Sequence, residues 1–116
     1  MIKKFEDLNV WKDAVDLSIK IHNLLKDCKD FSLRDQIQRS TISIASNIAE
    51  GYERTNKEFI HFLLISKGSC SELRTQIYIA KEIGIFTLEQ GEELIESTRK
   101  ISAMLNKFIS VRKSDF

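Results

Sequence analysis

The chain has 116 residues, the size of one typical domain, and 42% of them are hydrophobic, which is enough to bury a core. Its 18 Lys and Arg residues almost balance its 17 Asp and Glu residues, and a formal net charge of +1 excludes an arginine-rich arm or an acidic tail as the basis of function. We therefore expect a single domain over residues 1–116.

No stretch of the sequence approaches the roughly 18 to 20 apolar residues of a membrane span, and the first residues lack the apolar core of a signal peptide. Cys28 and Cys70 match no zinc or redox spacing and are too few for a disulfide framework, so we expect reduced thiols. These features predict a soluble, cytoplasmic protein without a membrane partner.

The chain contains no proline, which predicts long helices joined by brief turns. The first helix is predicted over about residues 7–27. Its apolar stripe has spacings of three and four residues and includes one small polar residue, Ser18: Leu8, Trp11, Val15, Ser18, Ile21 or His22, and Leu25. The second helix is predicted to begin with a cap at Ser32 and to end at Gly51. Its stripe is Leu33, Ile37, Thr41, Ile44 and Ile48.

The third helix is predicted to run from a capping box at Thr55 and Glu58 to a stop at Gly84, and to be the longest of the four. Its stripe is Phe59, Phe62, Leu63, Ser66, Cys70, Leu73, Ile77 and Ala80. The fourth is predicted from a capping box at Thr87 and Gln90 to about Arg112. Its stripe is Leu94, Thr98, Ile101, Leu105, Phe108 and Ile109. Short connections make neighbouring helices antiparallel, so the predicted fold class is all-α: a rod-shaped, antiparallel up-down-up-down four-helix bundle.

Three large apolar residues fall outside these stripes, namely Ile42 in the second helix and Ile60 and Leu64 in the third. They could belong to wide buried faces of central helices. We favour an oligomer interface, because each helix of a small bundle should keep one side in water.

Small residues cluster around Gly68 in the third helix. Since a glycine within a helix costs about 1 kcal/mol relative to alanine, we expect Gly68 to serve close packing, level with Ser102 and Ala103 of the fourth helix. A phosphate-cradling loop is the disfavoured alternative, because such loops need irregular, glycine-rich backbone ahead of a helix.

The sequence QIQRSTISIASNIAEG of residues 36–51 resembles the signature of the 23S rRNA intervening-sequence proteins. Further landmarks of that family occur in the same order at residues 8–11, 58–63, 68–73 and 79–80. Two departures are Gln38, where the family has a second arginine, and residues 31–33, where it usually has a proline-containing turn.

This resemblance implies a bundle that assembles into a ring, commonly a homopentamer, in bacteria. A related branch is the accessory variability protein of diversity-generating retroelements, a pentamer that binds a reverse transcriptase and nucleic acid. The expected partners are therefore further copies of the chain, RNA or DNA, and a nucleic-acid-processing protein.

No segment of the chain is strongly basic, but a ring would join weak positive patches into one band. The candidate nucleic-acid-binding residues are Arg39, Arg54, Lys57, Lys67, Arg74 and Lys81. A second basic group ends the fourth helix: Arg99, Lys100, Lys107, Arg112 and Lys113. Glutamates begin that helix, so the helix dipole explains the group at least as well as phosphate binding does.

No catalytic, cofactor or metal site is predicted. His22 and His61 lie on different helices without a ligand pattern, and neither Glu50 nor Glu72 has the histidine three residues later that di-metal bundle sites use. The sequence thus predicts a non-enzymatic, oligomeric scaffold that binds RNA or other nucleic acid. The alternative is an adaptor that recruits an enzyme, such as a reverse transcriptase, without touching nucleic acid.

Overall fold

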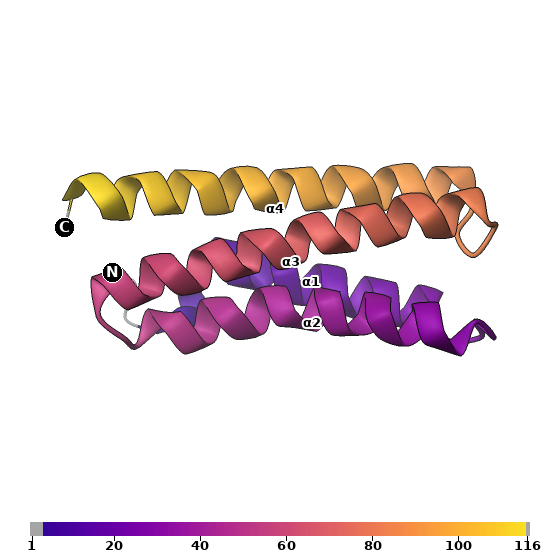
Figure 1. The fold of residues 1–116 in the computed structure, drawn as a ribbon, viewed down its shortest axis with the longest axis horizontal. Coiled ribbons are helices and arrows are strands. Elements are labelled where there is room, and N and C mark those ends of the chain that lie inside the picture. The colour runs from indigo at the N-terminus through magenta and orange to yellow at the C-terminus, as the bar shows by residue number, and fades with distance from the viewer. Residues whose placement is uncertain (1–3, 116) are drawn as a thin grey trace.

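The computed structural model describes residues 4–115 and confirms the all-α class. A short 3-10 turn, η1 (Phe5–Asp7), precedes four helices: α1 (Asn9–Leu24), α2 (Phe31–Tyr52), α3 (Asn56–Glu82) and α4 (Leu88–Asp115). Each helix packs antiparallel on the next and α4 also contacts α1, which confirms the up-down-up-down bundle (Figure 1). Extents of 45 × 22 × 19 Å confirm the rod shape.

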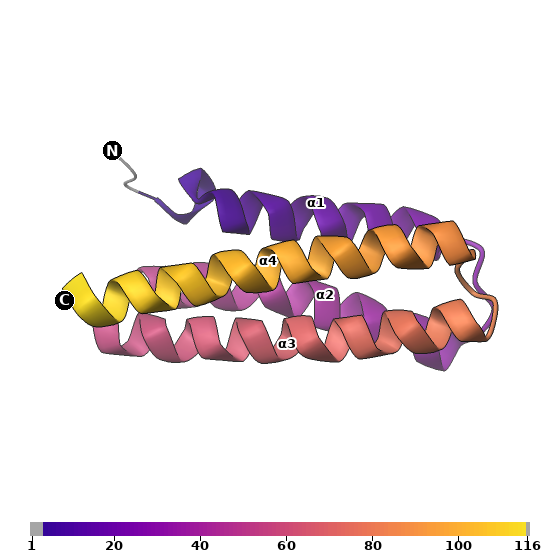
Figure 2. The ribbon, with the colours of Figure 1, turned by 90° about the horizontal axis from the view of Figure 1, so that it is seen from above.

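The bundle has two distinct ends. The α1–α2 and α3–α4 connections lie together at one end, and the α2–α3 turn lies at the other, near the end of α4 (Figure 1). Seen from above, α1 and α3 form opposite edges of the molecule (Figure 2). Surfaces on these two helices therefore point away from each other.

The buried face of α1 differs from the predicted stripe. The predicted Leu8, Ile21 and Leu25 are buried, but Trp11 and Val15 are only partly buried. In their place the core takes residues one position earlier along the middle of the helix, Val10, Ala14 and Leu17. Helix α1 carries two adjacent apolar stripes, and the bundle buries the one that contains Ala14, whose small side chain lets the helices approach closely. The second stripe is turned toward α2.

Both predicted ends of α2 were wrong by one or two residues. Asp30 is the N-cap, since its carboxylate accepts a hydrogen bond from the Leu33 amide at 3.1 Å, and Ser32 lies within the first turn. Gly51 does not stop the helix, which continues to Tyr52. Instead Gly51 is buried, and a Cβ there would lie 2.5 Å from the Cβ of Phe62. The glycine therefore serves the close packing of α2 on α3.

The predicted starts of α3 and α4 are confirmed. Thr55 accepts a hydrogen bond from the Glu58 amide at 3.2 Å, and its hydroxyl also lowers the pKa of the Glu58 carboxyl. Thr87 and Gln90 bond each other reciprocally. Gly84, with a φ of 83°, ends the third helical segment in the left-handed conformation that glycine adopts readily.

Helix α4, with 28 residues, exceeds α3, with 27, so the prediction that the third helix is the longest was wrong. Interactions of Arg112 hold the last turns of α4 in place. Its guanidinium donates to Asn56 Oδ1 at 3.1 Å and stacks on the rings of Phe59 and Phe108.

The expected packing role of Gly68 within the chain was also wrong. Gly68 is exposed, and nothing lies within 4 Å of the position that a Cβ would occupy. The predicted register of α3 against α4 is correct nonetheless, because Ser102 donates to the Cys70 sulfur at 3.3 Å.

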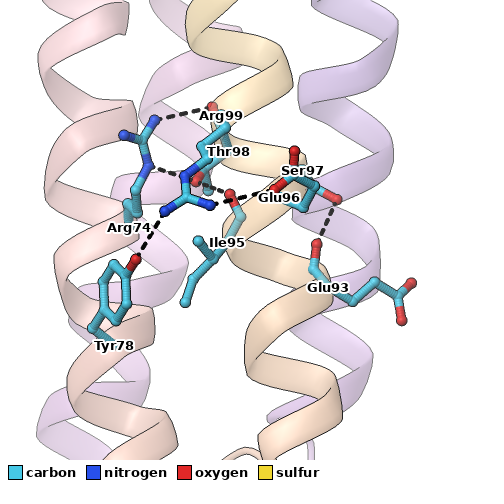
Figure 3. A network of polar contacts seen from close by, with 8 residues as sticks. All are labelled: Arg74, Tyr78, Glu93, Ile95, Glu96, Ser97, Thr98 and Arg99. Carbon is cyan, nitrogen blue, oxygen red and sulfur yellow. Dashed lines mark hydrogen bonds and ion pairs between the residues drawn. The ribbon is translucent and has the colours of Figure 1, made fainter.

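Arg74 of α3 fastens this register (Figure 3). Its Nε donates to Thr98 Oγ1 at 2.9 Å, and its Nη2 donates to the Thr98 carbonyl at 3.3 Å and to Ser102 Oγ at 2.9 Å. Arg99 makes a second link, donating to the Tyr78 hydroxyl at 3.2 Å. Arg74 thus acts as a clamp between α3 and α4.

The cap of α2 can be tested with two neighbouring substitutions. Asp30→Ala removes the acceptor of the Leu33 amide and should lower the free energy of unfolding by about 1 kcal/mol. Ser32→Ala should change it by less than about 0.5 kcal/mol. Urea unfolding followed by circular dichroism measures both. If Ser32→Ala lowered the free energy of unfolding more than Asp30→Ala does, Ser32 and not Asp30 would be the N-cap.

The clamp predicts that Arg74→Ala lowers the free energy of unfolding by about 1 to 3 kcal/mol, since Thr98 Oγ1 and Ser102 Oγ then lose their donor. The control is Lys67→Ala on the same helix, which should cost less than about 0.5 kcal/mol. The same unfolding assay applies. Equal, small effects would show that Arg74 does not fasten the helices.

Candidate functional site

Three of the six predicted nucleic-acid-binding residues have charged groups without a partner among the described residues. Within the described part of the chain, Arg39, Lys57 and Lys67 form no ion pair and no hydrogen bond. Arg39 and Lys57 are exposed, and Lys67 is half-buried. These three cations are the ones that a phosphate could reach without breaking an existing contact.

The other three candidates already have intramolecular partners. Arg54 pairs with Glu50 at 3.3 Å and with Glu58 at 3.5 Å, and Arg74 is the clamp described above. The Lys81 ammonium lies 5.3 Å from the centroid of the Tyr78 ring. Arg54 and Arg74 in particular serve the fold of the single chain.

The six positions do not form one patch on a monomer. Lys57 begins α3 and Lys81 ends it, and 24 residues of helix separate them by about 36 Å. In the basic group of α4, Arg99 and Arg112 also have intramolecular partners, whereas Lys100, Lys107 and Lys113 are exposed. Any broad positive surface would need several copies of the chain.

An apolar groove of about 330 Å³ lies between α1 and α2; we call it the α1–α2 groove. Its lining is free of charged side chains: Phe5, Trp11, Val15, Ser18, Ile19, Ile42, Ala45, Ser46 and Ala49. Ile19 is 56% exposed and Ile42 is 55% exposed. Of this set the sequence analysis predicted only Ile42 as an interface residue, and it placed Trp11 and Val15 in the buried stripe.

A second apolar surface, the α3 ridge, follows the outer face of α3. It consists of exposed residues within one arc of the helix: Leu64, Ile65, Gly68, Ser71, Thr75 and Ile79. Between residues 64 and 79, Glu72, at the edge next to α2, is the one charged residue of this arc. Leu64 was predicted as an interface residue and is 46% exposed, whereas Ile60 is partly buried against the core.

The described residues offer little that resembles a catalytic centre. Glu50 and Glu72 bind different partners, Arg54 and Ser40, and no group of three His, Cys, Asp or Glu side chains in the described chain could hold a metal ion. Burial raises the pKa of the Cys70 thiol, which donates to the Thr98 carbonyl.

The histidines have no shared site, since His22 contacts Gln38 of α2 at 3.2 Å and His61 lies on α3. Among residues 4–115, no helix has the length and apolarity to cross a membrane.

Residues 6–107 match the family model of the 23S rRNA-intervening sequence protein. A crystal structure of a protein of unknown function from the S23 ribosomal protein family of Bacteroides thetaiotaomicron VPI-5482 is similar, with a TM-score of 0.81 and 26% identity. The match covers 86% of this chain and 97% of that one. A search of curated proteins found no match. The family match extends over most of the bundle, and the chain belongs to the 23S rRNA-intervening sequence protein family.

Proposed function

We propose that this protein is a non-enzymatic scaffold that assembles from several copies of the chain and binds RNA or other nucleic acid in the bacterial cytoplasm. The observation that carries the proposal is the pair of apolar surfaces, the α1–α2 groove and the α3 ridge. Exposed apolar side chains that gather on one face of a protein mark sites of interaction, and this chain gathers them on two faces.

The two surfaces differ in shape and position, which favours a ring. The α1–α2 groove is concave, the α3 ridge is an exposed helix face, and α1 and α3 form opposite edges of the bundle (Figure 2). A contact between two different surfaces repeats from copy to copy, and it closes into a ring when the rotation allows. A homopentamer, as the family resemblance implies, is the assembly that we propose.

Gly68 supports contact at the α3 ridge. Its place within a helix costs about 1 kcal/mol relative to alanine, and no neighbour in the same chain uses the space that it leaves. A helix from another copy would use this space, because small residues let two helix backbones approach closely. We therefore expect the packing that favours glycine at position 68 to come from another copy of the chain.

Assembly would also let the weak positive charge of each chain contribute to phosphate binding. Arg39, Lys57 and Lys67 are too few for strong phosphate binding by one copy. Repetition around a ring multiplies these cations and raises the local positive potential. Nucleic acid would then bind to the assembly and not to the isolated bundle.

The assembly predicts that Ile42→Glu, in the α1–α2 groove, and Leu64→Glu, in the α3 ridge, each yield a folded monomer of 13.4 kDa. Size exclusion with light scattering measures the mass, and circular dichroism checks helicity. The control is Val111→Glu, an exposed apolar residue of α4 outside both surfaces, which should leave the oligomer intact. A wild-type protein that is already monomeric would contradict the proposal.

Nucleic-acid binding predicts a steep salt dependence of RNA affinity. For a single-stranded RNA, each phosphate contact should contribute about 0.7 log units of affinity per log unit of salt, so Lys57→Gln should reduce the slope in the oligomer. Lys29→Gln, an exposed change in the α1–α2 connection, is the control. Fluorescence anisotropy at several salt concentrations measures the slopes. An oligomer that does not bind RNA would contradict this function and favour that of an adaptor that recruits an enzyme.

A further inference from the structure

A second groove, of about 280 Å³, lies between α2 and α3 and is lined by polar side chains. We call it the polar groove; its residues are Gln36, Arg39, Ser40, Ser43, Glu72 and Gln76. It is distinct from the α1–α2 groove, and Glu72 stands on its border with the α3 ridge. Ser40 and Ser43 also bond to α3 and help to pack α2 on it, whereas Arg39 and Gln76 Oε1 have no such contact within the described chain.

One wall of the polar groove presents hydrogen-bond acceptors. Ser40 Oγ donates to Glu72 Oε1 at 2.8 Å, which fixes the carboxylate and leaves Oε2 without a partner in the described chain. Gln76 is only 8% exposed, and its Oε1 is buried without a hydrogen bond. Among the described residues, Thr41 Oγ1 is the other buried side-chain atom without a partner, and Gln76 Oε1 is the one that lies in the wall of this groove.

Arg39 supplies the donors at the rim of the same groove. Its guanidinium carries five N–H groups, and within the described residues it forms neither an ion pair nor a hydrogen bond. Glu72 lines the groove but does not pair with Arg39. The polar groove therefore combines a fixed acceptor, a buried acceptor and a free planar donor.

We infer that the polar groove binds a guanine base. Guanine presents two adjacent donors, N1–H and the 2-amino group, which match the carboxylate of Glu72. On the adjacent edge it presents O6 and N7, the two acceptors that arginine binds most often in base recognition, and these match Arg39. The groove lies just below the usual size range of small-molecule pockets, which suits one base more than a whole nucleotide.

The other bases fit this arrangement less well. Adenine and cytosine each offer a single amino group with an acceptor beside it, and uracil offers one N–H between two carbonyls. None of them places two adjacent donors against a carboxylate. Guanine is thus the base that satisfies Glu72 and Arg39 together.

The base could come from a free guanine nucleotide or from single-stranded RNA, whose unstacked bases proteins read in this way. Only the RNA source rests on the proposed function. The first arm is therefore calorimetric titration of the wild-type protein with GMP, IMP and AMP. GMP should bind about tenfold or more tightly than IMP, which lacks the 2-amino group, and than AMP.

Variants assign the effect to the groove. Glu72→Gln and Arg39→Gln should each weaken GMP binding about tenfold, whereas Glu82→Gln, an exposed change on the same helix, should not. Circular dichroism and light scattering confirm that each variant keeps its fold and mass. Equal binding of GMP and AMP, or an unchanged Glu72→Gln variant, would each overturn the inference. No GMP binding at about 1 mM overturns it when the second arm also shows no preference for guanine.

The second arm uses short single-stranded RNAs that differ by guanine or inosine at one position. Tighter binding of the guanine RNA, lost in Glu72→Gln, supports the inference with RNA as the source. Salt-dependent RNA binding without any preference for guanine, in RNA or as GMP, overturns the inference and leaves the proposed function standing. GMP binding without RNA binding supports the groove and overturns the nucleic-acid function.

Discussion

The close approach of α2 and α3 is the constraint on which the rest of the molecule depends. Small side chains make it possible, since Gly51 leaves room for Phe62, and the Ser66 hydroxyl donates to the Ile44 carbonyl at 2.9 Å. Ser43 and Ser69 add a bond at 2.9 Å between the two helices. These contacts fix the register of the pair, and hydrogen bonds between buried polar groups specify one register more sharply than apolar contacts can.

That register decides what the outer surfaces contain. It places Ser40 beside Glu72 and thereby forms the polar groove, while Ile42 turns toward α1 and Gly68 turns to solvent. On the other side of α3, the hydrogen bond from Arg74 to Thr98 fixes the register of α4 against α3 (Figure 3). Helix α3 therefore lines the polar groove, carries the α3 ridge and holds α4 through Arg74.

The positive side chains fall into two groups, those with partners in the chain and those without. Arginines that pair within the chain, such as Arg74 and Arg112, stabilise neighbouring helices through planar, multiply bonded contacts. The lysines and the arginine without partners are spread along the rod. A chain of this kind gains a broad positive surface only by repetition, which connects its apolar faces to its proposed binding of nucleic acid.

The sequence alone determined the number of helices, their order, the starts of α3 and α4 and the end of α3, because helix periodicity and caps depend on residues close together in the chain. The buried stripes of α3 and α4 were predictable for the same reason. The choice of stripe in α1 was not, since Trp11 and Ala14 both fit a helical period and only packing selects Ala14 for the core.

The tertiary structure likewise decided which cationic side chains have partners within the chain. Nothing in the sequence distinguishes Arg39 from Arg74, which resemble each other as helix-borne cations, but Thr98 and Ser102 of α4 engage only Arg74. Gly51 and Gly68 are two further cases of identical residues with opposite surroundings. Local patterns set the helices, whereas contacts between residues distant in sequence decided what each helix buries and what it offers to a partner.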